Sequence, residues 1–252
     1  LIDLLAKKED SPEKTSLQKG QQLATAIMSI ALKAHLQQGH IDRTDVVLQS
    51  LDEVQGEGGG GTNILKMLAA LIRLQVEEVR KKGDKAALDK AIQGYKALLK
   101  KRTEKLARTP DVVQALAACY SSMEEHGAAA LEHRAINKGP VNEKDPVSKG
   151  SRLMYIRALR LSKEPANLKE ARKLIDEIMA PVGKKPGWGA RDLSALKEDG
   201  LLLHDEGKYA QAFAMWTPLL KRLAPEISKG GNIRETYFEI YYYMVYSFYK
   251  AG

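Results

Sequence analysis

The stretch GKYAQAFAMWTPLLKRLAP, residues 207–225, decides the fold class of this 252-residue chain. Gly207 permits a tight turn, and the residues after it carry apolar side chains at helical spacing. Ala212 is small enough to let two helices approach closely, and Trp216 fills the space toward the next pair of helices. Pro225 cannot continue a helix. The stretch therefore predicts one helix of a stacked helical hairpin.

Helical spacing also dominates the rest of the chain, and no stretch shows strand alternation bounded by hairpin turns. Thr62 is expected to cap the third helix, and Asp84 to open the fourth. The first helix has one apolar stripe, made of Leu23, Ile27, Ile30, Ala31 and Ala34. We expect an all-α fold with helices near residues 16–38, 42–54, 62–83, 84–106, 110–125, 126–136, 147–162, 166–179, 191–206, 209–223 and 233–250.

The pattern of residues 207–225 returns earlier in weaker form. Its small or apolar anchors are Ala91, Leu131, Ala171 and Ala212, which follow one another at intervals of 40 or 41 residues. The motif Gly207-x-Tyr209-x-x-Ala212-x-x-x-Trp216-x-x-Leu219, with Pro225 after it, resembles the second helix of a tetratricopeptide repeat. The family's repeat is roughly 34 residues long, so the longer interval leaves armadillo-like or HEAT-like stacking open.

The resemblance implies a right-handed superhelix of about five and a half antiparallel hairpins, each burying its apolar faces against its neighbours. We expect residues 1–252 to form one such domain, with an irregular seam at residues 137–150, which hold two prolines and two glycines. Gly252 falls where the resemblance places the turn glycine of the last hairpin. We therefore expect the chain to be a piece of a longer protein.

No set of residues predicts catalysis, a cofactor or a metal site. Gly56-x-Gly58-x-x-Gly61 matches a dinucleotide fingerprint, but a helix is expected where that motif requires a strand. The single cysteine, Cys119, excludes an intramolecular disulfide and is expected to be a small buried residue. The five histidines lack metal-binding spacing and are expected at the surface. No membrane span or secretory signal is apparent, and the compartment stays open.

The formal charge of +8 is concentrated between Lys81 and Arg108, where ten basic residues face three acidic ones. This segment is expected to be a solvated helix face. The alternative is a site for RNA or another polyanion, formed by Lys96, Lys100, Lys101, Lys105 and Arg108. No aromatic residue shares the polar side with these cations, so stacking of bases has no support.

The last predicted helix is exceptionally aromatic. Eight of the fifteen aromatic residues lie between Tyr237 and Tyr249, which is more apolar surface than one helix side can bury. Three explanations stay open: a hairpin partner that follows in a longer chain, a partner segment or second copy that associates here, or a cap within the chain.

In the tetratricopeptide family the second, fifth, ninth and twelfth residues of each first helix form the concave surface. Carried over, these positions are Leu153, Ile156, Arg160 and Lys163, then Ser194, Lys197, Leu201 and His204, then Glu239, Tyr242, Tyr246 and Tyr249. The resemblance implies a non-catalytic scaffold that binds a peptide or helical segment of another protein. The residues predicted to contact it are Ile156, Arg160, Lys163, Lys197, His204, Tyr242, Tyr246 and Tyr249.

The three tyrosines would anchor that segment, and the cations would favour acidic residues in it. Two other functions stay open besides this one. The first is the polyanion site described above. The second is a docking or regulatory part of a longer enzyme, whose catalytic domain would lie outside these residues.

Overall fold

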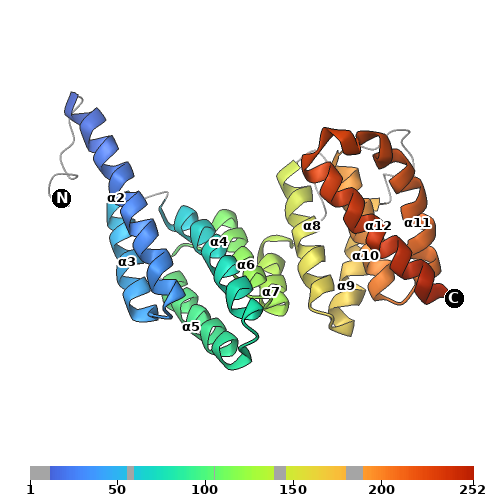
Figure 1. The fold of residues 1–252 in the computed structure, drawn as a ribbon, viewed down its shortest axis with the longest axis horizontal. Helices are drawn as coiled ribbons and strands as arrows, with labels where there is room; N and C mark the ends of the chain where they lie inside the picture. The colour runs from blue at the N-terminus through green and yellow to red at the C-terminus, as the bar shows by residue number, and fades with distance from the viewer. Residues whose placement is uncertain (1–11, 56–59, 105, 139–145, 180–189) are drawn as a thin grey trace. The chain divides into compact units, whose positions relative to one another are not determined.

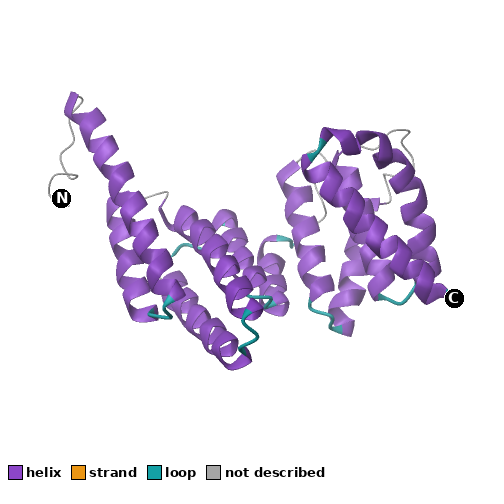
Figure 2. Cartoon of the chain, in the orientation of Figure 1, coloured by secondary structure: helices purple, strands orange, loops and turns teal. Residues whose placement is uncertain are grey.

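The computed structural model describes residues 12–55, 60–104, 106–138, 146–179 and 190–252 (Figure 1). Every regular element within these ranges is helical, which confirms the all-α class (Figure 2). The contacts divide the chain into two compact units, Leu1–Glu132 and His133–Gly252, which we call unit 1 and unit 2. The boundary lies within helix α7 (His126–Ile136), just before the seam expected at residues 137–150.

In the described part of unit 1, five helices precede α7: α2 (Pro12–Gln37), α3 (Ile41–Gln55), α4 (Gly60–Lys81), α5 (Lys85–Thr103) and α6 (Pro110–Ser122). Helices α2 and α3 pack against each other, and α4 contacts α2, α3, α5 and α6. Asp84 caps α5 as expected, because its carboxylate accepts a hydrogen bond of 2.9 Å from the amide of Ala87. The unit is thus organised around α4.

Hydrocarbon side chains fill the interior of unit 1. The largest fully buried ones include Leu32, Leu48, Ile64, Leu68 and Ile72, on α2, α3 and α4. Cys119 of α6 belongs to the same core, as expected, and its thiol donates to the carbonyl oxygen of Leu65 at 3.3 Å. The ion pair of Arg80 with Glu124 at 2.5 Å lies at the surface, whereas Lys101 pairs its exposed ammonium with the buried carboxylate of Asp45.

Unit 2 stacks its helices in chain order: α8 (Pro146–Leu161), α9 (Pro165–Met179), α10 (Ala190–Asp205), α11 (Tyr209–Leu223), a short 3-10 helix (Ala224–Lys229) and α12 (Gly231–Ala251). Helices α8 and α9 form one hairpin, and α10 contacts both of them. Helix α12 in turn contacts both α10 and α11. Helix α10 therefore packs on the α8–α9 hairpin, and α12 packs on the pair formed by α10 and α11.

The motif of residues 207–225 forms the turn and the close packing between α10 and α11. Gly207 adopts a φ of 75° in the turn between α10 and α11, a conformation that favours glycine. Trp216 of α11 is fully buried, and a Cβ placed on Gly200 of α10 would lie 2.0 Å from its Nε1. Only a glycine at position 200 leaves room for the indole at this helix contact.

Two local predictions are wrong. Helix α4 begins at Gly60, so Thr62 lies inside its first turn and does not cap it. On α2 the expected stripe is exposed at Leu23, Ile27 and Ile30, whereas Leu32 and Leu36 are buried. Because α2 carries apolar residues on more than one side, its periodicity does not determine which side packs.

Candidate interaction surface

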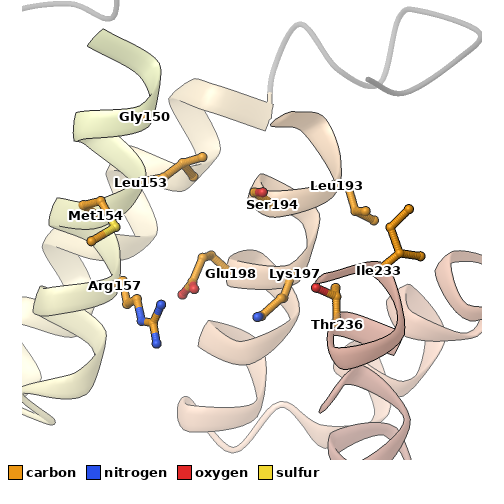
Figure 3. Close-up of a pocket in the computed structure, with 10 residues that line it drawn as sticks. All are labelled: Gly150, Leu153, Met154, Arg157, Leu193, Ser194, Lys197, Glu198, Ile233 and Thr236. Atoms are coloured by element: carbon orange, nitrogen blue, oxygen red, sulfur yellow. The ribbon is translucent and has the colours of Figure 1, made fainter. Parts of the chain in front are cut away.

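A pocket of about 580 Å³ lies among the three helices α8, α10 and α12 of unit 2 (Figure 3). Helices α8 and α10 contribute most of its wall, and the first turns of α12 close one side. The lining residues are Gly150, Leu153, Met154, Arg157, Leu193, Ser194, Lys197, Glu198, Ile233 and Thr236. The pocket is thus built from alternate helices of unit 2.

The wall of the pocket combines apolar side chains with one available cation. Leu153 and Met154 lie one helical turn before Arg157, so all three side chains reach the pocket from α8. Arg157 is exposed and has no ion-pair partner among the described residues. Leu193 and Ile233 add apolar surface from α10 and α12 (Figure 3). The pocket can therefore hold an apolar group that carries a negative charge beside it.

The other charged groups of the pocket are already paired. Lys197 of α10 contacts Glu239 of α12 at 2.5 Å, and Glu198 accepts a hydrogen bond of 3.1 Å from Arg160 Nε. Figure 3 shows the side chains of Arg157, Lys197 and Glu198 directed into the space between α8 and α10. Since Lys197 and Glu198 are each paired within the unit, the unpaired charge of the lining is positive.

Beneath the pocket lies a buried ionic network. Arg160 is only 6% exposed and also donates to Asp205 at 2.9 Å, while Lys163 donates to the other oxygen of Asp205 at 2.6 Å. Burial alone would raise the pKa of Asp205, but the hydrogen bonds and the positive charges of Lys163 and Arg160 together outweigh it and hold the pKa below its usual range. The network joins α8 to α10 through charge-assisted hydrogen bonds.

A second network joins α9 to α10. Arg172 of α9 contacts Asp199 at 2.5 Å and Glu206 at 3.0 Å. Burial raises the pKa of Asp199, whereas hydrogen bonds from Arg172 and Lys208 hold the pKa of Glu206 below its usual range against the effect of burial. Together the two networks tie α8 and α9 to α10, and so hold in place the two helices that form most of the pocket wall.

His204 of α10 lies in an aromatic enclosure near the far end of the α10–α12 contact. Its ring centroid is 5.2 Å from those of Tyr243 and Tyr246 and 6.3 Å from that of Trp216. Both ring nitrogens are buried without a hydrogen-bond partner, and Nδ1 lies 3.7 Å from an oxygen of Asp205. Burial lowers the pKa of His204 and outweighs the opposite effect of this carboxylate. The imidazole is therefore kept neutral at pH 7.

The three tyrosines predicted as anchors lie on exposed parts of α12. Tyr242 and Tyr246 stack with centroids 6.3 Å apart, and Lys250 lies 5.6 Å from the Tyr246 ring. Tyr249 is 79% exposed. Tyr246 contacts His204 of α10, as Glu239 contacts Lys197, so Tyr242 and Tyr246 continue the surface that begins at the pocket.

The structure separates the predicted contact residues into three groups. Ile156 and Arg160 are buried, and both ring nitrogens of His204 are buried among aromatic rings, so these groups are not available at the surface. Lys163 and Lys197 reach the surface, but each is paired with a carboxylate of α10 or α12. Of the predicted residues, the tyrosines of α12 retain free surface. Arg160, Lys163 and Lys197 are therefore already paired with carboxylates of this unit. The cation available to an acidic partner is Arg157, which the family positions do not include.

Three of the five cations predicted to bind a polyanion are paired with carboxylates of unit 1. Lys96 pairs with Glu125 at 3.1 Å and Lys101 with Asp45 at 2.5 Å, and Arg108 pairs with Glu132. Lys100 is exposed, and Lys105 lies outside the described residues. The charge excess counted along the sequence overstates the free positive charge at this surface.

The cysteine and the buried histidine that were considered as candidate reactive residues lie in the packed interior. Cys119 is buried, and burial raises its pKa to about 12, so its thiol stays protonated. His133 was expected at the surface, but it is 3% exposed against Tyr155, and burial lowers its pKa to about 4. Gly56 and Gly58 lie outside the described residues, whereas Gly61 is within α4.

The described residues contain no cluster of three or more His, Cys, Asp or Glu side chains that could hold a metal ion. None of the helices described is both long enough and apolar enough to cross a membrane.

Comparison with known proteins adds no family to this description. No protein-family model matches the chain, and neither the curated proteins nor the solved structures contain a significant match to it. The candidate surface therefore depends on its own geometry. Arg157 and Met154 could have been found from the sequence, because they lie on one helix side with Leu153, whereas Ile233 and Thr236 join the pocket only through tertiary packing.

Proposed function

We propose that this protein is a non-catalytic scaffold that binds an extended or helical segment of another protein on the α8, α10 and α12 side of unit 2. The proposal includes a tetratricopeptide-like arrangement of the hairpins. Its support is that α10 contacts both α8 and α9, and that α12 contacts both α10 and α11. In a stack of this kind the first helices of the hairpins share one surface, which is where the pocket lies.

The observation that carries the proposal is the composition of this pocket. Its apolar wall can take one leucine-sized or phenylalanine-sized side chain, and Arg157 can bind a neighbouring carboxylate with two parallel hydrogen bonds. Full burial of such a side chain is worth about 1.5–3 kcal/mol. A hydrogen bond to a charged group adds about 1.5–3 kcal/mol.

Ordering the segment costs part of this free energy, so we expect micromolar affinity for one anchor. Tyr242 and Tyr246 extend the contact along α12 beyond the Lys197–Glu239 pair. Tyrosine presents a large apolar ring with a polar end, which suits a surface that is exposed when no partner is bound. A segment that spans the pocket and these rings would bind more tightly than its anchor alone.

A library of random peptides displayed on phage tests the proposal on the whole chain. We expect selection of peptides with one bulky apolar residue next to Asp or Glu. Met154→Asp places a charge in the pocket wall at a side chain that is already 49% exposed, and it should abolish recovery of these peptides. Leu131→Asp is the matched control, since Leu131 of α7 is exposed and does not line the pocket.

Recovery of the same peptides by the Met154→Asp protein would reject this pocket as the binding site. Loss of recovery with both variants would also count against it, because the effect would then follow from added charge at any exposed apolar residue. The far-UV circular dichroism of both variants should match that of the unchanged protein, since neither side chain belongs to the buried core.

A further inference from the structure

Helix α12 has a second exposed side, on which the pocket does not depend. We call it the outer stripe, and it consists of Phe238, Tyr241, Val245, Phe248 and Tyr249. These side chains are between 47 and 79% exposed. Residues that line the pocket from α12 are Ile233 and Thr236, and neither belongs to the outer stripe.

The spacing of the outer stripe is that of a helix–helix contact. Phe238, Tyr241, Val245 and Phe248 follow one another at intervals of three, four and three residues, which is the alternation found at the apolar positions of a coiled coil. Such a row stays on one side of a helix over its whole length. The partner that this row can accommodate is therefore another helix with the same spacing.

The opposite side of α12 is fixed in the core of unit 2. Ile240 and Ser247 are buried, and Tyr237 and Met244 pack partly into the core formed with α10 and α11. The outer stripe therefore cannot become buried by rotation of α12 about its own axis, because rotation would expose this inner side. Covering the outer stripe requires a surface from outside unit 2.

The exposed area is large enough to matter. At about 150–250 Å² for a whole aromatic side chain, the outer stripe exposes roughly 500 Å², near the upper end of the largest apolar patch on an ordinary monomer. Two such stripes in contact bury about 1,000 Å² before flanking atoms are counted, which is near the lower limit for a specific protein–protein interface.

We propose that a second copy of this chain covers the outer stripe with its own α12. The stripe is self-complementary, because bulky rings at both ends flank the smaller Val245 and can fill the space beside it in the other copy. The modest area makes the dimer a weak one, formed at micromolar concentration. Unit 2 alone supplies every residue that the contact needs.

Arg234 determines the direction of the two helices. It is exposed at the start of the row, one heptad before Tyr241, and has no ion-pair partner among the described residues. Parallel helices would place the two Arg234 side chains next to each other, which is unfavourable. An antiparallel pair in which Phe238 lies opposite Phe248 brings each Arg234 within about one helical turn of Tyr249 of the other copy, where its long side chain can stack a guanidinium on the aromatic ring.

Sedimentation velocity of the whole chain over a concentration series tests the proposal. The unchanged protein should shift from monomer to dimer as its concentration rises. Val245→Asp should weaken dimerisation by about tenfold or more, as expected for a charge at the centre of an interface. Val46→Asp is the matched control, since Val46 of α3 is also an exposed valine and should leave the dimer unchanged.

A second variant shows whether loss of the dimer in Val245→Asp results from misfolding. Tyr249→Asp changes a side chain that is 79% exposed, so its helix content should stay the same while dimerisation weakens. A monomer at every concentration, or a dimer that neither substitution weakens, would overturn the proposal. Neither result would bear on peptide binding at the pocket, which Met154→Asp tests separately.

Direction can be tested with the variants Phe238→Cys and Phe248→Cys under mild oxidation. Mixing the two proteins should give a disulfide-linked heterodimer, and neither protein alone should form one as readily. Native Cys119 does not interfere, because it is buried. Equal cross-linking of each variant to itself would contradict the antiparallel arrangement.

Discussion

The two units of this protein stabilise their helices in different ways. Unit 1 packs hydrocarbon side chains around α4, and the cations of ion pairs such as Arg80–Glu124 and Lys101–Asp45 stay exposed, although Asp45 itself is buried. Unit 2 buries a guanidinium, Arg160, between two carboxylates of α10, and a second network joins Arg172 to α10. The difference shows that the same apolar periodicity is compatible with two kinds of interior. A charged residue on a helix is therefore not necessarily at the surface.

The chain has a natural probe for each unit. Its single cysteine, Cys119, belongs to the core of unit 1, and both tryptophans, Trp188 and Trp216, belong to the sequence of unit 2. Reaction of Cys119 with a thiol reagent reports opening of unit 1, because its thiol is buried and its pKa is raised to about 12. Tryptophan fluorescence during urea unfolding reports unit 2. The following predictions use both probes.

The largest difference is expected for loss of an arginine. Arg160→Ala should lower the free energy of unfolding of unit 2 by about 3–5 kcal/mol, because Glu198 and Asp205 lose a buried partner. Arg80→Ala should cost unit 1 less than about 1 kcal/mol, since the pair of Arg80 with Glu124 is solvent-exposed. Equal losses in the two urea titrations would mean that the buried network is no more important than a surface pair.

The next largest difference is expected for an added methyl group. Gly200→Ala should destabilise unit 2 by about 1–3 kcal/mol or more, because the new Cβ would lie 2.0 Å from the buried indole of Trp216. Gly94→Ala in α5 meets only the side chain of Ile41, at 2.9 Å, which can move. Helix propensity offsets that contact, so unit 1 should change little. A stable Gly200→Ala protein would refute the close approach of α10 and α11.

A smaller difference is expected on acidification. His133 of unit 2 has a usual pKa of 6.5 that burial lowers to about 4, so the unfolded state binds a proton more readily than the folded state. The free energy of unfolding of unit 2 is therefore unaffected by protonation of His133 above pH 6.5. It falls by up to roughly 3 kcal/mol as the pH is lowered toward 4. The pKa of His204 is lowered as well, so it acts with the same sign.

Urea unfolding followed by tryptophan fluorescence at several pH values measures this loss. His133→Gln should flatten the dependence of unit 2 between pH 6.5 and 4. Labelling of Cys119 should show that unit 1 remains folded over the range in which unit 2 weakens. An unchanged slope in the His133→Gln protein would show that His133 is not kept neutral by burial.

The sequence predicted the helices well, because their periodicity is local. The range of α11 was predicted at both ends, and Asp84 and Gly207 were recognised as a helix cap and a turn from their own chemistry. What the sequence could not show is which polar groups become buried. Arg160 and His133 were both expected at the surface, and only the packing of neighbouring helices removes them from solvent.

The candidate site was predicted in part for the same reason. The use of the first helices of the hairpins followed from the resemblance, and Lys197 does line the pocket. Arg157 was missed, because the family positions skip it. The pairing of Lys163 with Asp205 was missed as well, because it joins residues 42 positions apart in the sequence. Exposed aromatic residues of α12 were recognised from composition alone, since no arrangement of one helix buries all of them.

The most direct test of the proposed interaction surface is a comparison of peptides selected by the unchanged protein and by an Arg157→Glu variant from one random library. Arg157 is exposed and unpaired among the described residues, so reversing its charge should leave both units folded. The account predicts that acidic residues beside the apolar anchor are enriched by the unchanged protein and replaced by basic ones in the variant. Selection of the same peptides by both proteins would contradict it.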